Sequence, residues 1–313
     1  MPVRRFALAA RKAHAGLFWF TLTMAATAAV LVLLVIVDRR TLLGQPVWFK
    51  PLKFALSFAL YATSFAWMMS LLPAPGRWLR RAASVAVGAG VLEMVIIVGQ
   101  AARGRRSHFN LDTPVDSALY GVMGAAVAVL WLATAVLAAR VVRIRGIDPA
   151  ATAAVRAGLV IGLAGAALGV TLVLHDGHGV GVPDGGPGLW LLGWSTTGGD
   201  LRIGHFIGMH ALQLLPLLAV VLTVAGQRRL DDRRRLAVVH IAAATYAAVV
   251  VVVTWQAYRA QPLLSPDGLT LTAWAVIVVG AGTALAIALR RPTDARQPER
   301  PLADEVPAAP ASS

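Results

Sequence analysis

Long apolar runs separated by short polar segments occupy the chain from residue 16 to residue 289. Eight runs approach the roughly 20 residues that a helix needs to cross a bilayer. They lie at about 16–37, 52–72, 82–101, 115–139, 150–174, 203–225, 236–258 and 269–289. No small-residue cleavage site follows the first run, which therefore reads as a span and not as a signal peptide. The pattern predicts an all-α fold, a polytopic transmembrane helix bundle of about eight spans.

Several run ends carry helix-capping signals. Asp148-Pro149 and Ser265-Pro266 each place a capping side chain before a proline at the first helical position. Thr113-Pro114 does the same, and Asp116 is spaced to complete a capping box. Pairs of small residues in the fifth and sixth spans, Gly158/Gly162, Gly165/Gly169 and Gly204/Gly208, predict close helix packing.

Composition agrees with a membrane protein. Of 313 residues, 58% are hydrophobic and 14% charged, against about 25% charged in soluble domains. The net charge of +14 does not indicate nucleic-acid binding, because the basic residues form short clusters between apolar runs. Membrane lipid is the expected partner, and the oligomeric state is left open. The chain has no cysteine, which excludes disulfides and thiolate metal sites.

The basic residues also predict orientation. If the N-terminus is cytoplasmic, the inner segments carry 20 of the 29 basic residues and the outer segments carry 9. We therefore expect both termini in the cytoplasm of a bacterial-type cell and the chain in the plasma (inner) membrane. Residues 1–15 would be a basic N-terminus, 16–289 the membrane domain and 290–313 a disordered tail. The first two outer loops are also basic and depart from this pattern.

Polar groups inside the third span are the first functional candidates, because ionisable side chains in a bilayer are costly. Glu93 lies near the middle of that span, and Gln100 follows seven residues later on the same face. One interpretation is a proton or cation relay. The other is a protonated Glu93 that hydrogen-bonds a neighbouring helix.

The sixth span carries the densest polar cluster. Arg202, His205 and Gln213 share one face, with His210 beside it, while glycines occupy the opposite face. The alternatives are a binding site and structural hydrogen bonding. Two outer segments are predicted to meet this face: one contains Lys50 and Lys53, the other His108, Asn110 and Asp116. The lysines suit an anion or lipid phosphate, or could extend to the interface.

Metal binding has weak support. His175 and His178 form an H-x-x-H pair with an intervening acid in a glycine-rich loop, and His205 and His210 are too far apart around their helix for a ready metal pair. The cofactor, if any, stays unknown.

Three strings resemble motifs of an uncharacterised family of bacterial multi-spanning inner-membrane proteins. They begin at Gln45 (Q-P-x-W-x-K-P-x-K-F), at Ser107 (S-H-F-N) and at Gly199 (G-D-L-R-x-x-H-F-x-G-x-H-A-x-Q). The resemblance implies the architecture and no activity.

Three functions fit these residues. A polar, histidine-containing site that opens to the extracytoplasmic side favours transport or sensing of a small molecule, ion or proton. The alternatives are a membrane-embedded enzyme that depends on zinc or haem, and a structural or assembly protein.

Overall fold

The computed structural model describes residues 8, 10–144, 148–226 and 230–290. Eight helical segments of this part are long and apolar enough to cross a membrane, which makes the chain a multi-pass, all-α membrane protein. Their bounds are α2 Ala15–Val37, α3 Phe49–Ser70, α4 Arg77–Ala102, α5 Pro114–Val141, α6 Pro149–Ala167 continued by α7 Gly169–Leu174, α8 Arg202–Gly226, α9 Asp232–Tyr258 and α10 Gly268–Leu289. The predicted number of spans is confirmed.

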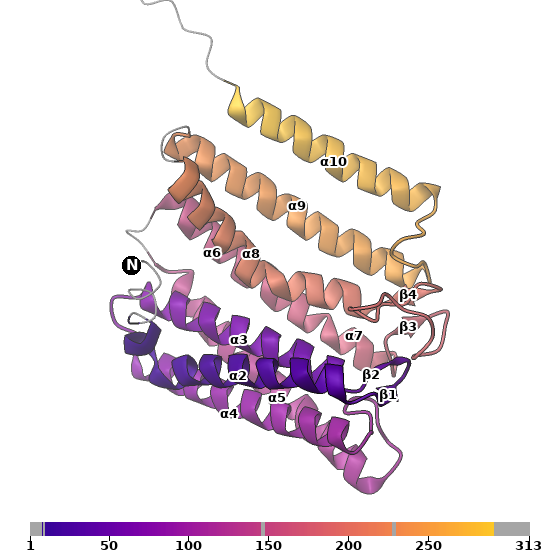
Figure 1. Ribbon diagram of the computed structural model, residues 1–313. Helices are drawn as coiled ribbons and strands as arrows, with labels where there is room; N and C mark the ends of the chain where they lie inside the picture. Colours follow the sequence, from indigo (N-terminus) through magenta and orange to yellow (C-terminus); the bar gives the residue numbers. More distant parts are fainter. Residues whose placement is uncertain (1–7, 9, 145–147, 227–229, 291–313) are drawn as a thin grey trace, which may run out of the picture.

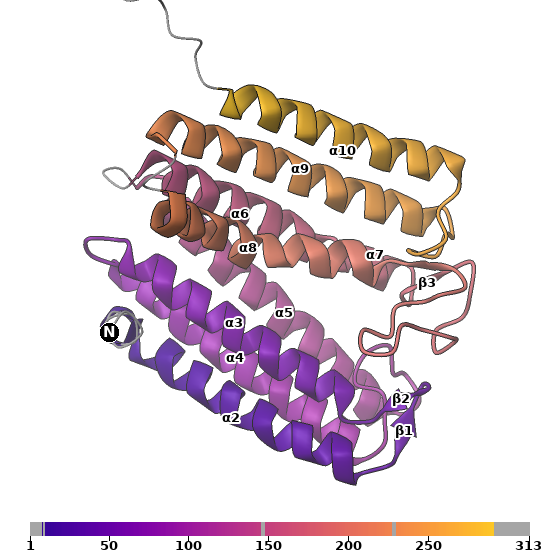
Figure 2. The same ribbon diagram turned by 45° about the horizontal axis from the view of Figure 1, so that its top comes forward.

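The helices form two groups that follow chain order (Figures 1 and 2). In the first group α2 packs on α3 and α4 packs on α5, around a core that includes Leu17, Phe65, Met69 and Leu79. In the second group α6 packs on α8, and α9 and α10 follow in turn. The two groups meet where α5 lies beside α6 and α3 approaches α8.

Successive helices run in opposite directions, so their connections gather at two ends (Figure 1). We call the end with the segments 38–48, 103–113, 175–201 and 259–267 the loop end, and the opposite end the tail end. The loop end holds two small antiparallel hairpins. In one, β1 (Thr41–Leu42) pairs with β2 (Gln45–Pro46); in the other, β3 (Gly179–Val180) pairs with β4 (Gly199–Asp200).

Two of the three predicted caps are confirmed. Asp148 accepts a hydrogen bond from the backbone N–H of Ala151, and Thr113 accepts one from that of Asp116. The third was wrong: α10 is capped by Asp267, whose carboxylate accepts from the N–H of Thr270, and not by Ser265. Asp267 also pairs with Arg259 at the end of α9. A carboxylate that caps one helix and binds the other fixes this turn better than a serine hydroxyl.

The predicted glycine contacts hold α6 against α8. A Cβ atom added to Gly165 would lie 2.3 Å from the backbone of Gly208, and one added to Gly158 would lie 2.8 Å from the carbonyl oxygen of Ala211. Only residues without a side chain allow this approach. α8 also approaches α3.

The outer helix α10 packs on α9, and Thr270 is its one buried residue among those described. Its remaining surface is apolar and exposed, as lipid contact requires. Residues 1–7, where the predicted basic N-terminus begins, and the predicted disordered tail from 291 lie outside the described residues.

Candidate functional site

Glu93 is completely buried in α4, and neither carboxyl oxygen has a hydrogen-bond partner among the described residues. The alternative of a protonated Glu93 that bonds a neighbouring helix therefore finds no partner in this part of the chain. Nine residues separate Glu93 from the loop end of α4 at Ala102, which corresponds to about 13 Å. A buried carboxyl without a partner is costly in its charged form. The protonation state of Glu93 therefore depends on the charges near it.

The charge that acts on Glu93 is that of Lys50, in the first turn of α3. Its ammonium and the Glu93 carboxyl attract each other through the protein interior. The Lys50 Nζ atom lies 3.1 Å from Nδ1 of His108, in the loop between α4 and α5. Because an ammonium only donates, Nδ1 must be the unprotonated acceptor. Lys50 therefore contacts an imidazole of a loop and attracts the buried carboxyl of α4 without contacting it.

His108 is enclosed by aromatic rings. Phe54, Phe109 and Tyr120 have ring centroids 5.7, 6.4 and 6.2 Å from the imidazole centroid. Burial holds the pKa of His108 well below its ordinary value, and the charges of Lys50 and His205 lower it further. His108 is thus a neutral hydrogen-bond acceptor.

A short turn fixes the loop that carries His108. Phe109 has a positive φ of 53°, which turns the backbone sharply after His108. Asn110, the only asparagine of the chain, has no exposed surface. Its amide donates to the carbonyl of Arg106 at 2.9 Å and accepts from the N–H of Asp112 at 3.2 Å. Asn110 therefore holds the turn that positions His108.

Gln100 and Asp116 form a second polar cluster, between α4 and α5. Gln100 donates to Asp116 at 2.8 Å, and Arg103 donates to both side chains. Asp116 also accepts from the hydroxyl of Thr113. All these partners are local, so the cluster fastens the two helix ends together.

The histidines of α8 have different surroundings. His205 lies 2.8 Å, Nδ1 to oxygen, from the carbonyl of Gly165, where α6 is interrupted before α7. A carbonyl only accepts, so Nδ1 of His205 carries the proton. His210 contacts Gln213 of its own helix, at 3.3 Å. The charge of His205 acts on His108. Among the hydrogen bonds of the described residues, His210 and Gln213 have none to α3, α4 or α5.

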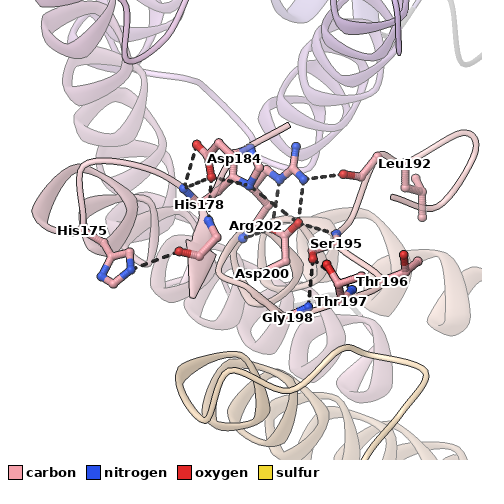
Figure 3. A network of polar contacts seen from close by, with 12 residues as sticks. His175, His178, Asp184, Leu192, Ser195, Thr196, Thr197, Gly198, Asp200 and Arg202 are labelled. Atoms are coloured by element: carbon pink, nitrogen blue, oxygen red, sulfur yellow. Dashed lines mark hydrogen bonds and ion pairs between the residues drawn. The ribbon is translucent and has the colours of Figure 1, made fainter. Parts of the chain in front are cut away.

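A charged network closes the loop end above α8 (Figure 3). Asp200 accepts two hydrogen bonds from the Arg202 guanidinium and one from the N–H of Ser195. Nδ1 of His178 lies 3.2 Å from Asp184 and 3.8 Å from Asp200, without the alignment of a hydrogen bond. Burial and the Arg202 charge keep the pKa of His178 below its ordinary value in spite of both carboxylates.

The weak metal candidates do not converge. His175 turns away from His178 and contacts the carbonyl of Gly179 (Figure 3). In the described part of the chain, no group of three or more His, Asp or Glu side chains is arranged to hold a metal ion.

Lys53 lies one turn after Lys50 and contacts the long 175–201 loop. Its Nζ atom is 3.4 and 3.2 Å from the carbonyl oxygens of Leu191 and Leu192, and 3.5 Å from Oε1 of Gln45. Gln45 in turn donates to the carbonyl of Trp190. The loop is therefore tied to the start of α3.

A polar cavity of about 560 Å³ opens at the loop end, between the 103–113 and 175–201 loops. Its walls include Arg106, Asp112, Asp184 and Phe109. Because Phe109 also packs beside His108, a single aromatic residue borders both the cavity and the buried His108–Lys50 pair.

Comparison of the chain with models of protein families, with curated proteins and with solved structures finds no match. The function must therefore be argued from the residues themselves.

The sequence analysis selected Glu93, His108 and His205 but did not distinguish Lys53 from Lys50, which is the residue that contacts His108. It also missed Tyr120 and Phe54, whose rings enclose that imidazole. The helical spacing of Lys50 and Phe54, four residues apart on one face of α3, was the available signal.

Proposed function

We propose that the protein is a proton-linked transporter of a bacterial plasma membrane, in which Glu93 is the proton-binding group and Lys50 and His108 connect it to the loop end. The observation that carries the proposal is the buried Glu93 carboxyl, which has no hydrogen-bond partner in the described residues and faces the field of the Lys50 ammonium. Intramembrane ionisable groups of this kind mark ion and proton pathways.

The chemistry follows from two charge states. When Glu93 is protonated, it no longer offsets the positive charge of Lys50. When Glu93 is ionised, the two charges attract each other across the interior, where Coulomb forces are stronger than in water. Lys50 lies in the first turn of α3, and Glu93 lies in α4. Binding or release of one proton therefore changes the electrostatic force between these two helices. A force that switches between two helices can drive the movement that transport requires.

The cavity at the loop end supplies an approach for solvent. Protons would reach the interior past Phe109 and the neutral imidazole of His108, which can accept a proton when Lys50 releases its contact. The excess of basic residues at the tail end supports the orientation in which the loop end is extracytoplasmic.

The test is proton entry into vesicles that contain the purified protein and a trapped pH dye. Phosphate or succinate is added outside, once without a membrane potential and once with an inside-negative potential set by a potassium gradient and valinomycin. We expect faster acidification with the wild-type protein than in protein-free vesicles. The variant Glu93→Gln, which keeps the shape of the side chain but cannot ionise, should acidify no faster than protein-free vesicles.

A matched control is Thr134→Val, which removes another buried polar group, bonded to Tyr61 in the same helix group. This variant should keep the wild-type rate. Equal rates for the wild type and Glu93→Gln would contradict the proposal, as would a wild-type rate no higher than that of empty vesicles under all conditions.

A further inference from the structure

Positive charge converges at the start of α3. Lys50 and Lys53 lie one helical turn apart on the same face, and the charge of Arg202, the first residue of α8, acts on both. Like charges held this close in a partly buried place repel each other. Something in the site has to offset that repulsion.

The carboxylates of the described residues offset this repulsion only in part, since Asp200 attracts Lys53 without contacting it. Asp200 is engaged by Arg202 and by the backbone of Ser195. Neither Lys50 nor Lys53 forms an ion pair with any carboxylate in the part of the chain that the structure describes. Glu93 attracts Lys50 from deeper in the bundle but does not bond it.

Neutral acceptors take the place of an anion. Lys50 donates to an imidazole nitrogen, and Lys53 donates to two backbone carbonyls and one amide oxygen at 3.2–3.5 Å. These distances are at the long limit for N–H···O hydrogen bonds. A carboxylate or phosphate oxygen would instead form short, charge-assisted bonds of about twice the strength.

The carbonyls belong to a loop that lies against Lys53. Residues 188–195 fold back on themselves through a bridge between Gly188 and Ser195. Arg202 donates to the carbonyl of Gly193, and Gln45 donates to that of Trp190. A loop that is held mainly by its carbonyl oxygens can be released when an anion takes over the same donors.

We propose that Lys50 and Lys53 bind a small anion that carries a carboxylate or phosphate group, under the cover of residues 188–195 and beside Arg202. The inference rests on the proposed transport function and names its substrate class. A bound anion and a proton on Glu93 would carry opposite charges, so their joint movement would transfer no net charge.

The test is equilibrium binding of radiolabelled phosphate and of radiolabelled succinate to the purified protein, with no proton gradient present. The protein is held in nanodiscs of phosphatidylcholine at constant ionic strength. We expect saturable binding of at least one probe. In Lys53→Met and in Lys50→Met the affinity should fall about tenfold or more, the loss expected for one charge-assisted hydrogen bond.

Two controls keep the result interpretable. Lys53→Arg preserves the charge and should retain most of the affinity even if Lys53→Met folds poorly. Arg39→Gln removes an exposed positive charge at the same end of the bundle and should leave affinity unchanged. Equal binding by the wild type and both methionine variants would overturn the site, as would the absence of saturable binding by both probes and by anionic lipid.

A second arm identifies the source of the anion. Nanodiscs that also contain phosphatidylglycerol should leave binding unchanged if the ligand is a free anion. Competition by that lipid, lost in Lys53→Met, would assign the site to a lipid phosphate. Because binding is measured without proton movement, its failure removes the anion site alone, whereas failure of Glu93→Gln to slow acidification removes the transport function alone.

Discussion

The Nζ atom of Lys50 lies 3.1 Å from Nδ1 of His108, so a lysine of the second span is bonded to an imidazole from the loop after the third. This contact requires a neutral His108. A proton on Nδ1 would remove the acceptor and place a second cation against the ammonium.

Acid should therefore weaken the fold at this contact. Burial, followed by the charges of Lys50 and His205, lowers the pKa of His108 in the folded protein. The unfolded chain then binds a proton first, so stability is complete above the ordinary histidine pKa of about 6.5 and falls as the pH drops below it. Thermal unfolding in detergent should show a larger loss between about pH 7 and pH 5 in the wild type than in His108→Gln. Parallel losses in both proteins would mean that His108 is not the titrating group.

The turn around Asn110 should be sensitive to a single deletion. Asn110→Ala leaves the carbonyl of Arg106 and the N–H of Asp112 without their partner. We expect a loss of about 1–3 kcal/mol in the free energy of unfolding. Asp112→Asn, in the same loop, changes an exposed group with ion pairs of 3.4 and 3.8 Å and should cost much less. Similar losses for the two variants would show that the asparagine does not hold the loop.

Glycine-to-alanine substitutions should have opposite effects at two positions. Gly165→Ala would place a methyl group 2.3 Å from the backbone of Gly208, and overpacking of this kind costs about 1–3 kcal/mol. Gly282→Ala in α10 meets open space and gains the higher helix propensity of alanine. Thermal unfolding should show Gly165→Ala below the wild type and Gly282→Ala at or above it. A neutral Gly165→Ala would mean that α6 and α8 can separate without cost.

The orientation can be tested by labelling, because the chain has no cysteine. Gly186→Cys places a thiol at the exposed loop end, and Arg233→Cys places one at the exposed tail end. An impermeant maleimide applied to intact cells should label Gly186→Cys alone, and both after the cells are opened. Labelling of Arg233→Cys in intact cells would reverse the proposed orientation.

The sequence predicted the spans because their signal is local. A run of apolar residues of the right length has few alternatives to a membrane helix. The glycine contacts were also predictable, since Gly165 and Gly208 mark one helix face each. In contrast, the cap at Ser265 was wrong because the choice of Asp267 depends on Arg259, which lies at the end of another helix.

The site was only partly predictable, because its contacts also depend on residues far apart in the chain. Glu93 stands out in the sequence because it lies in the middle of an apolar run. Its lack of a hydrogen-bond partner, however, depends on which helices surround it. Nothing local distinguishes Lys50 from Lys53; the difference is that one meets His108 and the other meets Leu191 and Leu192. The first pairing is set by the packing within the first helix group, and the second by the way that the two groups meet at the loop end.

The long sequence separation between Lys53 and its cover has a consequence for biogenesis. The carbonyl of Leu191 lies 138 residues after Lys53, so both lysines are synthesised and enter the membrane well before the loop that closes over them. A nascent chain that ends after the fifth span would already contain Lys50, His108 and Glu93 but would lack Arg202 and residues 188–195. During that interval the start of α3 must be shielded by water, lipid headgroups or the insertion machinery. When the sixth span is inserted, the start of α3 changes from a solvated helix end to one covered by residues of the chain.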